Sequence, residues 1–184
     1  FVPLKEEKIP KKKVIFSCHE TILFPLKEKP LQSVDTIHFV SEWQRDWQDV
    51  DTPSVVIPNI VDKCERKGSH KRGAVGIIGS IDSHKQTALA IQSALDSEPK
   101  DTRILIFGSV TDEGYYQEQV RSLIKNNNRV KIVGKYDDKT VMYNMIDAVY
   151  HASRAETYGL VRTAWNSLQR PVWVFQTFRI LGRR

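Results

Sequence analysis

The sequence has few of the features that mark membrane-spanning, disulfide-rich or metal-dependent proteins. No uninterrupted apolar run approaches the roughly 18 to 20 residues that a helix needs to cross a bilayer, and residues 1–5 contain no apolar core of a signal peptide. The chain has only two cysteines, Cys18 and Cys64, and neither stands in a CxxC or a Cys/His ligand spacing. These absences predict a cytoplasmic protein with reduced thiols, without a structural disulfide and without a metal site.

Motifs of several common enzyme classes are also missing. There is no HExxH, no GxSxG, no Walker A loop, no GxGxxG fingerprint and no EF-hand loop. The chain begins at Phe1 rather than at a methionine and stops shortly after an apolar stretch. We therefore expect it to be part of a longer protein, and its chemistry must be inferred from its loops rather than from one diagnostic motif.

The composition is that of an ordinary globular protein with a basic surplus. Of the 184 residues, 40% are hydrophobic and 27% are charged, and the formal net charge is +6. Lysines and arginines cluster in residues 11–13, 67–72 and 179–184, which favours phosphates, nucleic acid or an acidic membrane face as partners, or simply a solvated surface. No DNA- or RNA-binding motif is present, so we expect no nucleic-acid partner.

Short runs rich in β-branched residues alternate with amphipathic segments along the chain. Because these runs are almost continuously hydrophobic, they are typical of parallel strands covered on both faces. The alternation predicts an α/β fold: a Rossmann-like parallel sheet flanked by helices, with a partial second α/β segment. The expected strands are residues 14–16, 36–40, 54–57, 75–78, 104–107, 130–133, 148–150 and 172–175.

Helices are expected between these strands, each with an apolar stripe at helical spacing. The stripes are Ala88, Ile91 and Leu95; Tyr116, Val120, Leu123 and Ile124; and the pairs Val141 with Met145 and Met142 with Ile146. Residues 41–44 and 83–86 both have the Ser-x-x-Gln form of a capping box, which predicts helix starts. Trp43 and Trp47 lie four residues apart and are expected to pack along one helix face.

A polar, basic stretch divides the chain into two parts. We expect residues 1–62 to be the C-terminal portion of an incomplete α/β domain, because they supply only two or three strands. Residues 63–73 are the expected linker, and residues 74–184 the expected Rossmann-like domain.

Ligands of such sheets bind beyond the carboxyl ends of the strands, so the loops there hold the candidate site residues. The first loop, residues 79–85, begins with Gly79 and Ser80 and ends with Lys85 at an expected helix start. Helix N-terminal N–H groups and a nearby lysine favour an anion. The alternative is a plain β–α turn that binds nothing.

The second loop, residues 153–161, lies after the expected strand 148–150. Glycine allows the backbone to approach a ligand closely, and the backbone N–H groups that would face a phosphate at the next helix start are those of Gly159, Leu160 and Val161. Glu156 would lie beside this anion site as an acceptor for sugar hydroxyls, unless it is only an exposed loop acid.

A third candidate is His19, just beyond the first expected strand. A histidine at that edge can donate a hydrogen bond to a substrate carbonyl or hydroxyl, or titrate near neutral pH. The alternative is an ordinary surface or packed histidine.

The order of these segments resembles the family 4 glycosyltransferases of the GT-B fold. Each motif is weak alone, and the resemblance depends on their collinearity over residues 13–175. The matching segments are residues 38–44 and 56–62, which are similar to the family's "VS" and "IPNGVD" stretches, residues 79–85 for its "G…KG" loop, residues 105–108 for "L-x-I-x-G" and residues 153–161 for "S-x-x-E-x-F/Y-G-L-V".

This resemblance implies a retaining, metal-independent glycosyltransferase that takes a sugar from a nucleotide-diphosphate-sugar donor and needs no cofactor. The acceptor would be a glycan, a glycolipid or a protein, and a peripheral membrane contact stays open. Residues 74–184 would be the nucleotide-sugar-binding domain. The implied catalytic residues are Glu156 and His19, which lie near the transferred sugar. The implied donor-binding residues are Gly79, Ser80, Lys85, Gly159, Leu160 and Val161, with Lys85 holding the diphosphate.

Departures from the family pattern keep other functions open. The second acid of the family's E-x7-E motif falls on Ala164, and the arginine that commonly follows the first-loop glycine is Ser80. These changes favour a non-catalytic glycosyltransferase-like subunit or fragment as the alternative. Another GT-B enzyme, such as a nucleotide-sugar epimerase, would need further acidic and histidine groups that the sequence does not place.

Overall fold

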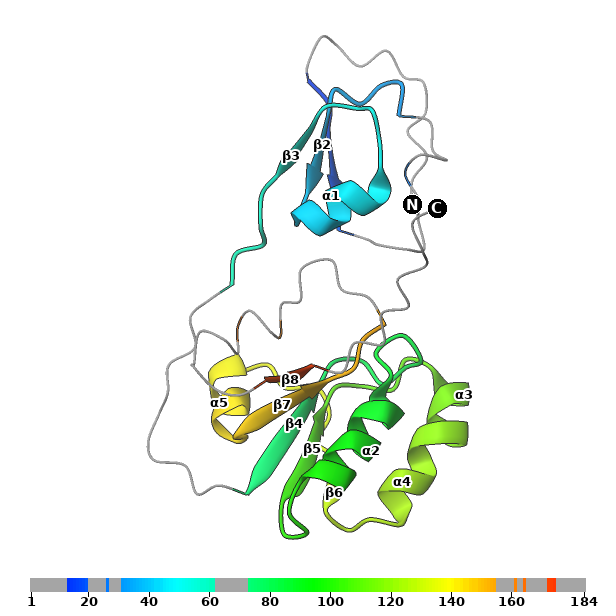
Figure 1. The fold of residues 1–184 in the computed structure, drawn as a ribbon, viewed down its shortest axis with the longest axis vertical. Coiled ribbons are helices and arrows are strands. Elements are labelled where there is room, and N and C mark those ends of the chain that lie inside the picture. Colours follow the sequence, from blue (N-terminus) through cyan, green and yellow to red (C-terminus); the bar gives the residue numbers. More distant parts are fainter. Residues whose placement is uncertain are drawn as a thin grey trace. The chain divides into compact units, whose positions relative to one another are not determined.

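The computed structural model describes residues 13–19, 26, 31–61, 73–154, 161, 164 and 172–174. The chain divides into two compact units, Phe1–Ile60 and Val61–Arg184, and each has its own sheet (Figure 1). Residues 63–72 of the predicted linker lie outside the described residues, so the predicted domain limits stay predictions. Within the described ranges, no helix combines the length and apolar character needed to cross a membrane.

The first unit contains a three-stranded parallel sheet. Its strands pair in the order β1 (Ile15–Cys18), β2 (Thr36–Phe39) and β3 (Ser54–Val56). Successive residues of a strand point to opposite faces, so one face buries Cys18, Ile37 and Phe39 in an apolar cluster. The other face carries Ser17 and His38, which are register partners on β1 and β2.

Helix α1 (Glu42–Gln48) confirms the helix start predicted at Ser41. Ser41 Oγ accepts a hydrogen bond from Gln44 N–H at 3.1 Å. The Gln44 side chain reaches one residue further back than in a capping box: its Oε1 accepts from Val40 N–H at 2.9 Å, and its Nε2 donates to Cys18 O at 3.1 Å. This buried amide therefore joins α1 to the end of β1.

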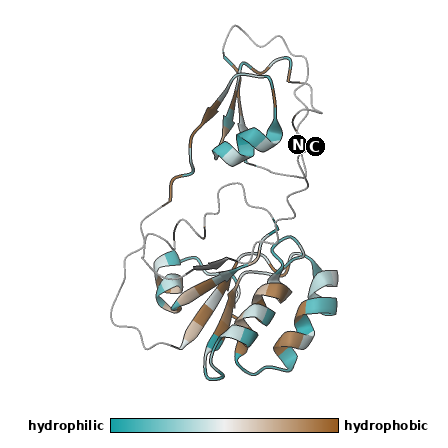
Figure 2. Cartoon of the chain, in the orientation of Figure 1, coloured by the Kyte–Doolittle hydropathy of each residue, from teal (hydrophilic) through white to brown (hydrophobic). Residues whose placement is uncertain are grey.

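Trp43 and Trp47 both lie on the more exposed side of α1, with exposed fractions of 38% and 36%, whereas the buried residues of α1 are Gln44 and Gln48. Their predicted packing along one helix face stays a prediction. Gln48 Oε1 accepts from Leu26 N–H at 2.8 Å. The buried side of α1 is thus held by amide hydrogen bonds, and the helix is mostly hydrophilic (Figure 2).

The second unit contains a five-stranded parallel sheet in the order β6-β5-β4-β7-β8. This arrangement confirms the predicted fold class, and all eight predicted strands are present with small shifts at their ends. The strands of this sheet are β4 (Ala74–Ile78), β5 (Arg103–Phe107), β6 (Val130–Ile132), β7 (Ala148–His151) and β8 (Val172–Val174).

Helices cover both faces of this sheet (Figure 1). Adjacent residues of β5 show the division: Ile104 packs with Ile91 in one apolar cluster, while Leu105 packs with Met142 in a second cluster. The helical segments are α2 (Thr87–Ser97), α3 (Glu113–Tyr115), the π-helical turn η2 (Tyr116–Val120), α4 (Arg121–Lys125) and α5 (Lys139–Asn144). Burial of both sheet faces explains why the strands are apolar throughout.

Two expectations for the helices need correction. The stripe from Tyr116 to Ile124 lies on consecutive segments η2 and α4 rather than on one regular α-helix. Of the two pairs predicted around α5, Met142 and Ile146 are buried, but Val141 and Met145 are 42% and 39% exposed. Neighbouring residues on a helix point in directions roughly 100° apart, so only one of the two pairs faces the sheet.

Tyr150 on β7 forms a hydrogen bond that gives stability a measurable pH dependence. Its hydroxyl donates to Glu98 Oε1 at 2.7 Å, and burial together with this contact raises the pKa of Tyr150 to about 12. The unfolded chain loses the tyrosine proton near pH 10. The stabilising contribution is therefore complete below about pH 10 and falls as the pH rises toward 12.

We expect the Tyr150→Phe variant to unfold at lower urea concentration at pH 7, with a loss of about 1 kcal/mol for the hydrogen bond. It should also lose less stability than the wild type between pH 9 and pH 11. Urea unfolding followed by circular dichroism at several pH values measures both effects. Tyr136→Phe, at a 37% exposed tyrosine, is the control. Identical alkaline slopes in wild type and Tyr150→Phe would contradict the role of this phenol.

Candidate functional site

The loops after β4 and β7 diverge at a topological switch point. β4 pairs with β5 on one side and with β7 on the other, so the chain leaves β4 toward one edge of the sheet and later continues toward the other. Parallel sheets bind ligands in the crevice that such a divergence opens. A small cavity of about 10 Å³ at this place is lined by Gly79, Ser80 and Lys85 from the first loop and by His151 and Ala152 from the end of β7.

The first loop is organised around the carboxylate of Asp82. Oδ2 accepts from Ser80 Oγ at 2.5 Å and from Thr111 Oγ1 at 3.0 Å, and Oδ1 accepts from Lys85 N–H at 2.7 Å. Partial burial opposes ionisation, but these hydrogen bonds and the nearby His84 outweigh it, and the pKa of Asp82 is lowered. The side chain is therefore a fixed anion that shapes the loop carrying Lys85.

The predicted capping box at residues 83–86 is wrong. α2 begins at Thr87, and its N-cap residue Gln86 has a left-handed backbone with φ 50° and no side-chain capping bond. The physical reason is Asp82, which holds Lys85 N–H and keeps the preceding residues in a turn. Tyr115 Oη accepts the Ala88 N–H at 2.9 Å and so occupies one of the N–H groups that were expected to face an anion.

The path of this loop depends on close contacts at two glycines, Gly79 in the loop and Gly108 after β5. Gly79 has φ 141°, and a Cβ there would lie 3.7 Å from Cγ and Cδ of Lys85, so the aliphatic part of the lysine covers Gly79. A Cβ on Gly108, which follows β5, would stand 1.8 Å from the carbonyl oxygen of Gly79. A residue without a side chain is thus needed at position 108 for the first loop to follow its path. In the sequence, only the place of Gly108 in the L-x-I-x-G segment indicated that it matters.

The start of the second predicted loop is hydrogen-bonded to the first loop. Arg154 N–H donates to His84 O at 2.9 Å, which joins the two loops at the rim that also holds Lys85. Glu156, Gly159 and Leu160 lie outside the described residues, so their predicted roles stay predictions. Arg154, whose positive charge acts on the Tyr115 hydroxyl, was missed by sequence reasoning because a single basic residue after a strand is a common surface feature.

Val161, at the end of this loop, and Ala164, beyond it, have apolar surroundings. Val161 is half-buried and Ala164 is 5% exposed, and both pack in the cluster that contains Phe107 and Val149. A glutamate at position 164 would place its carboxylate against these apolar side chains, which is costly without a polar partner. The apolar surroundings of position 164 therefore suit the alanine that replaces the second acid of the E-x7-E pattern.

His19 lies just past β1 in the first unit, as predicted, and is exposed. Its Nε2 is 3.0 Å from Ser17 Oγ. His19 belongs to the first unit and Lys85 to the second. Across the described ranges, no group of three or more histidines, cysteines, aspartates or glutamates is placed to hold a metal ion.

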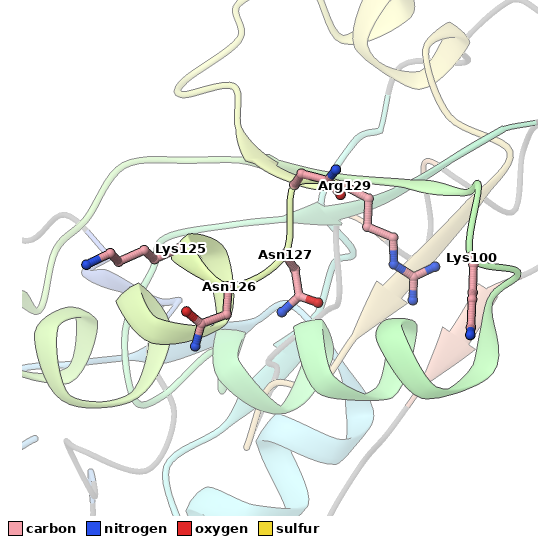
Figure 3. A pocket seen from close by; sticks show the side chains of 6 residues that line it. Lys100, Lys125, Asn126, Asn127 and Arg129 are labelled. Carbon is pink, nitrogen blue, oxygen red and sulfur yellow. The ribbon is translucent and has the colours of Figure 1, made fainter.

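A larger, basic basin of about 620 Å³ lies elsewhere in the second unit. Its residues include Lys100, Lys125, Asn127 and Arg129 (Figure 3). Arg129 donates to Leu95 O at 2.7 Å and to Pro99 O at 2.5 Å, and Asn127 Nδ2 donates to Leu123 O at 2.8 Å. These groups satisfy carbonyls around the C-termini of α2 and α4, where the helix dipoles favour cations and disfavour a bound anion.

Comparisons of sequence find no relative: no family model matches the chain, and no curated protein matches it. Comparison of structures finds HepE from Anabaena in complex with UDP and glucose, with a TM-score of 0.72, 18% identity, and coverage of 89% of this chain and 52% of HepE. The pneumococcal O-GlcNAc transferase GtfA, in complex with UDP and GlcNAc, has a TM-score of 0.61 and 13% identity, with coverage of 78% and 30%.

The lipopolysaccharide outer core galactosyltransferase WaaB aligns with a TM-score of 0.55 and 15% identity, over 82% of this chain and 47% of WaaB. The chain thus spans 30% to 52% of the length of these three proteins. Identities this low bear on architecture rather than on activity. The chain therefore has the fold of GT-B glycosyltransferases, over a part of their length.

Proposed function

We propose that this chain carries the donor-binding part of a retaining, metal-independent glycosyltransferase that uses a nucleotide-diphosphate sugar. The observation that carries the proposal is the meeting of the Lys85 loop and the β7 loop at the switch point of a parallel sheet. UDP is the donor nucleotide we favour, because HepE and GtfA, which share the fold, were solved with UDP. The acceptor is a glycan, a glycolipid or a protein.

In this proposal the protein acts mainly by positioning the donor and stabilising the leaving group. An acceptor hydroxyl oxygen forms a bond to the anomeric carbon on the face that the diphosphate leaves, so that the configuration is retained, and gives its proton to the departing diphosphate oxygen. The bond between the anomeric carbon and the diphosphate oxygen breaks, and its electron pair leaves with the diphosphate. The Lys85 ammonium and the backbone near Gly79 hold that growing negative charge, together with the N–H groups of residues 159–161. Glu156 orients the sugar. Arg154 supplies the second positive charge that Ser80 does not.

Replacing Lys85 by alanine tests the donor site directly. We expect the wild-type chain to be stabilised against heat by UDP. Lys85→Ala should bind UDP at least about tenfold more weakly, since a charge-assisted hydrogen bond to phosphate is lost. Isothermal titration calorimetry with UDP, and with GDP for comparison, measures the change.

Lys100→Ala is the matched control, because Lys100 lies in the basic basin away from the switch point. Its affinity for UDP should equal that of the wild type. Unchanged UDP affinity in Lys85→Ala would overturn the assignment of the donor site, and a loss in Lys100→Ala alone would transfer it to the basin.

A non-catalytic, nucleotide-sugar-binding relative is the second candidate, and the apolar surroundings of Ala164 favour it. Both candidates predict UDP binding that depends on Lys85. They differ in turnover: the enzyme should release UDP from a UDP-sugar in the presence of an acceptor or, slowly, by hydrolysis. Binding without any release of UDP would select the non-catalytic function.

A further inference from the structure

The sheet of the first unit carries a serine whose hydroxyl contacts a histidine ring. Ser17 Oγ lies 2.7 Å from His38 Nδ1, and on the far side of the same ring His38 Nε2 lies 2.8 Å from the carbonyl oxygen of Ile57. These groups have the order that an activated serine uses: a nucleophile, a base within hydrogen-bond reach, and a third group that orients the base. Ser17 is exposed, so a substrate can reach its oxygen.

The strand register brings these groups together. Ser17 on β1 is the register partner of His38 on β2, and His38 is the partner of Val55 on β3. Register partners project to the same face of a sheet, and this is the face opposite the apolar cluster that contains Phe39. Ile57 N–H donates to Phe39 O at 2.9 Å. The pairing therefore continues past the end of β3 and holds the Ile57 carbonyl beside the His38 ring.

The hydrogen-bond directions prepare Ser17 to lose its proton. A carbonyl oxygen only accepts, so His38 Nε2 carries the proton that it donates to Ile57 O. A neutral imidazole has one ring proton, so His38 Nδ1 accepts from the Ser17 hydroxyl. The ring is thus held in the tautomer whose basic nitrogen faces the serine. When His38 takes the serine proton, the Ile57 carbonyl stabilises the resulting imidazolium, as the third group of a catalytic triad does.

His19 offers a proton donor on another side of the serine oxygen. Its Nε2 lies 3.0 Å from Ser17 Oγ, and its ring stands edge to face with that of His38, with the centroids 5.9 Å apart. Because the Ser17 hydroxyl gives its one proton to His38, it accepts from His19, and His19 Nε2 is protonated. A nucleophilic attack by Oγ creates a negative oxygen next to Oγ, where such a donor stabilises it.

Aliphatic side chains border the serine and the histidine on this face. Ile15 precedes Ser17 by two residues on β1, and Val55 and Ile57 follow the β3 side of His38; all three aliphatic residues are exposed. Apolar side chains next to a few polar groups are typical of sites for small molecules with an apolar and a polar part. An ester with a short aliphatic acyl chain has both parts.

We propose that Ser17 and His38 are the nucleophile and the general base of an esterase site for short aliphatic carboxylic esters. All of its residues belong to the first unit, and the activity is independent of sugar transfer. Ser17 Oγ bonds to the ester carbonyl carbon while its proton passes to His38 Nδ1. The bond from that carbon to the alcohol oxygen then breaks, and His38 gives the proton to the departing alcohol.

Hydrolysis of the acyl-enzyme completes the cycle. A water oxygen bonds to the acyl carbon and gives a proton to His38 Nδ1. The bond between that carbon and Ser17 Oγ breaks, and His38 returns the proton to Oγ. In both halves of the cycle His19 Nε2 donates to the negative oxygen of the tetrahedral intermediate. The products are a carboxylic acid and an alcohol.

An irreversible serine reagent tests the nucleophile directly. Diisopropyl fluorophosphate should phosphorylate Ser17 of the full chain, with loss of fluoride, and peptide mass spectrometry should locate the adduct. Ser17→Ala should remain unlabelled, and His38→Gln should react at least about a hundredfold more slowly, as expected for a lost general base. Ser54→Ala, at an exposed serine of β3, should react like the wild type. Circular dichroism checks that each variant is folded. An unlabelled wild type, or labelling of Ser17 at the same rate in His38→Gln, overturns the proposal.

Hydrolysis of p-nitrophenyl butyrate and p-nitrophenyl acetate then tests the substrate class. The wild type should hydrolyse both esters, and Ser17→Ala should lose this activity. Ile15→Ser should lower the ratio of kcat/KM for butyrate to that for acetate at least about twofold, because the longer acyl chain loses apolar contact. Hydrolysis that persists in Ser17→Ala overturns the esterase site, and an unchanged ratio in Ile15→Ser overturns the acyl contact. Lys85→Ala should keep full esterase activity, so this site and the proposed donor site succeed or fail separately.

Discussion

Replacing Gly108 by alanine is expected to cost both stability and donor binding. The new Cβ would stand 1.8 Å from the Gly79 carbonyl oxygen and 2.7 Å from its carbonyl carbon. Both are backbone atoms, and the Gly79 N–H is itself bonded to Phe107 O at 3.0 Å, so the backbone cannot move aside without breaking the loop's attachment. Overpacking of this kind costs about 1 to 3 kcal/mol, occasionally more, and we expect about 3 kcal/mol here.

The displaced backbone is that of the loop that carries Lys85, so UDP affinity should fall together with stability. Gly114→Ala is the matched control, because a Cβ at Gly114 in α3 meets only Asp112 Oδ1, at an ordinary 3.6 Å. That variant should be neutral or more stable by up to about 1 kcal/mol, since alanine favours helix. Urea unfolding and UDP calorimetry measure both variants. If Gly108→Ala matches Gly114→Ala in both stability and UDP affinity, the backbone of Gly79 does not leave too little room for a side chain at position 108.

Sequence patterns predicted the parts of this fold that depend on continuous local signals. The β-branched runs at residues 75–78 and 104–107 became buried parallel strands, because strands covered on both faces must be apolar throughout. Ser41 predicted its helix start because the capping bond joins residues only three apart. Where both partners of an interaction lie within a few residues of each other, the interaction can be predicted from the local sequence.

Features that depend on distant partners could not be predicted in the same way. The start of α2 moved to Thr87 because Asp82 captures Lys85 N–H and is itself bonded to Thr111, 29 residues away. Likewise, Gly108 matters only because the backbone of Gly79 passes beside it. The sequence pointed to Gly79 and Lys85 through their loop, whereas Asp82 and Arg154 required the packed structure.

Asp82 gives the sharpest test of how the candidate site works, because two physical effects predict opposite results. A carboxylate near a bound diphosphate repels it, so removing the charge should strengthen UDP binding. The same carboxylate holds Ser80, Lys85 N–H and Thr111 in place, so removing it should loosen the loop and weaken binding. Repulsion between partly exposed charges is worth about 1 kcal/mol or less, whereas three hydrogen bonds to a charged acceptor are worth more. We therefore expect Asp82→Ala to bind UDP about tenfold more weakly.

Asp82→Asn separates the two effects. Its amide keeps one oxygen for Lys85 N–H, and the hydroxyls of Ser80 and Thr111 can rotate to accept from its NH₂ group. This variant should therefore bind UDP as well as the wild type or better. Asp101→Ala, at an exposed aspartate, controls for the lost charge. Tighter binding in Asp82→Ala would show that repulsion dominates and that the loop keeps its shape without the carboxylate.

The lowered pKa of Asp82 adds a pH test of the same hydrogen bonds. Its ordinary pKa is 3.8, so the stability gained from the folded carboxylate is complete above about pH 4 and is lost as the pH falls through the lower folded value. Wild type should therefore lose stability on acidification by more than Asp82→Ala, and the difference in stability between the two proteins should shrink as the pH falls. Protonation removes the charged acceptor, which alanine lacks at every pH. Equal acid slopes in the two proteins would therefore mean that the charge of Asp82 does not strengthen the loop's hydrogen bonds, and the expected loss of UDP affinity would lose its basis.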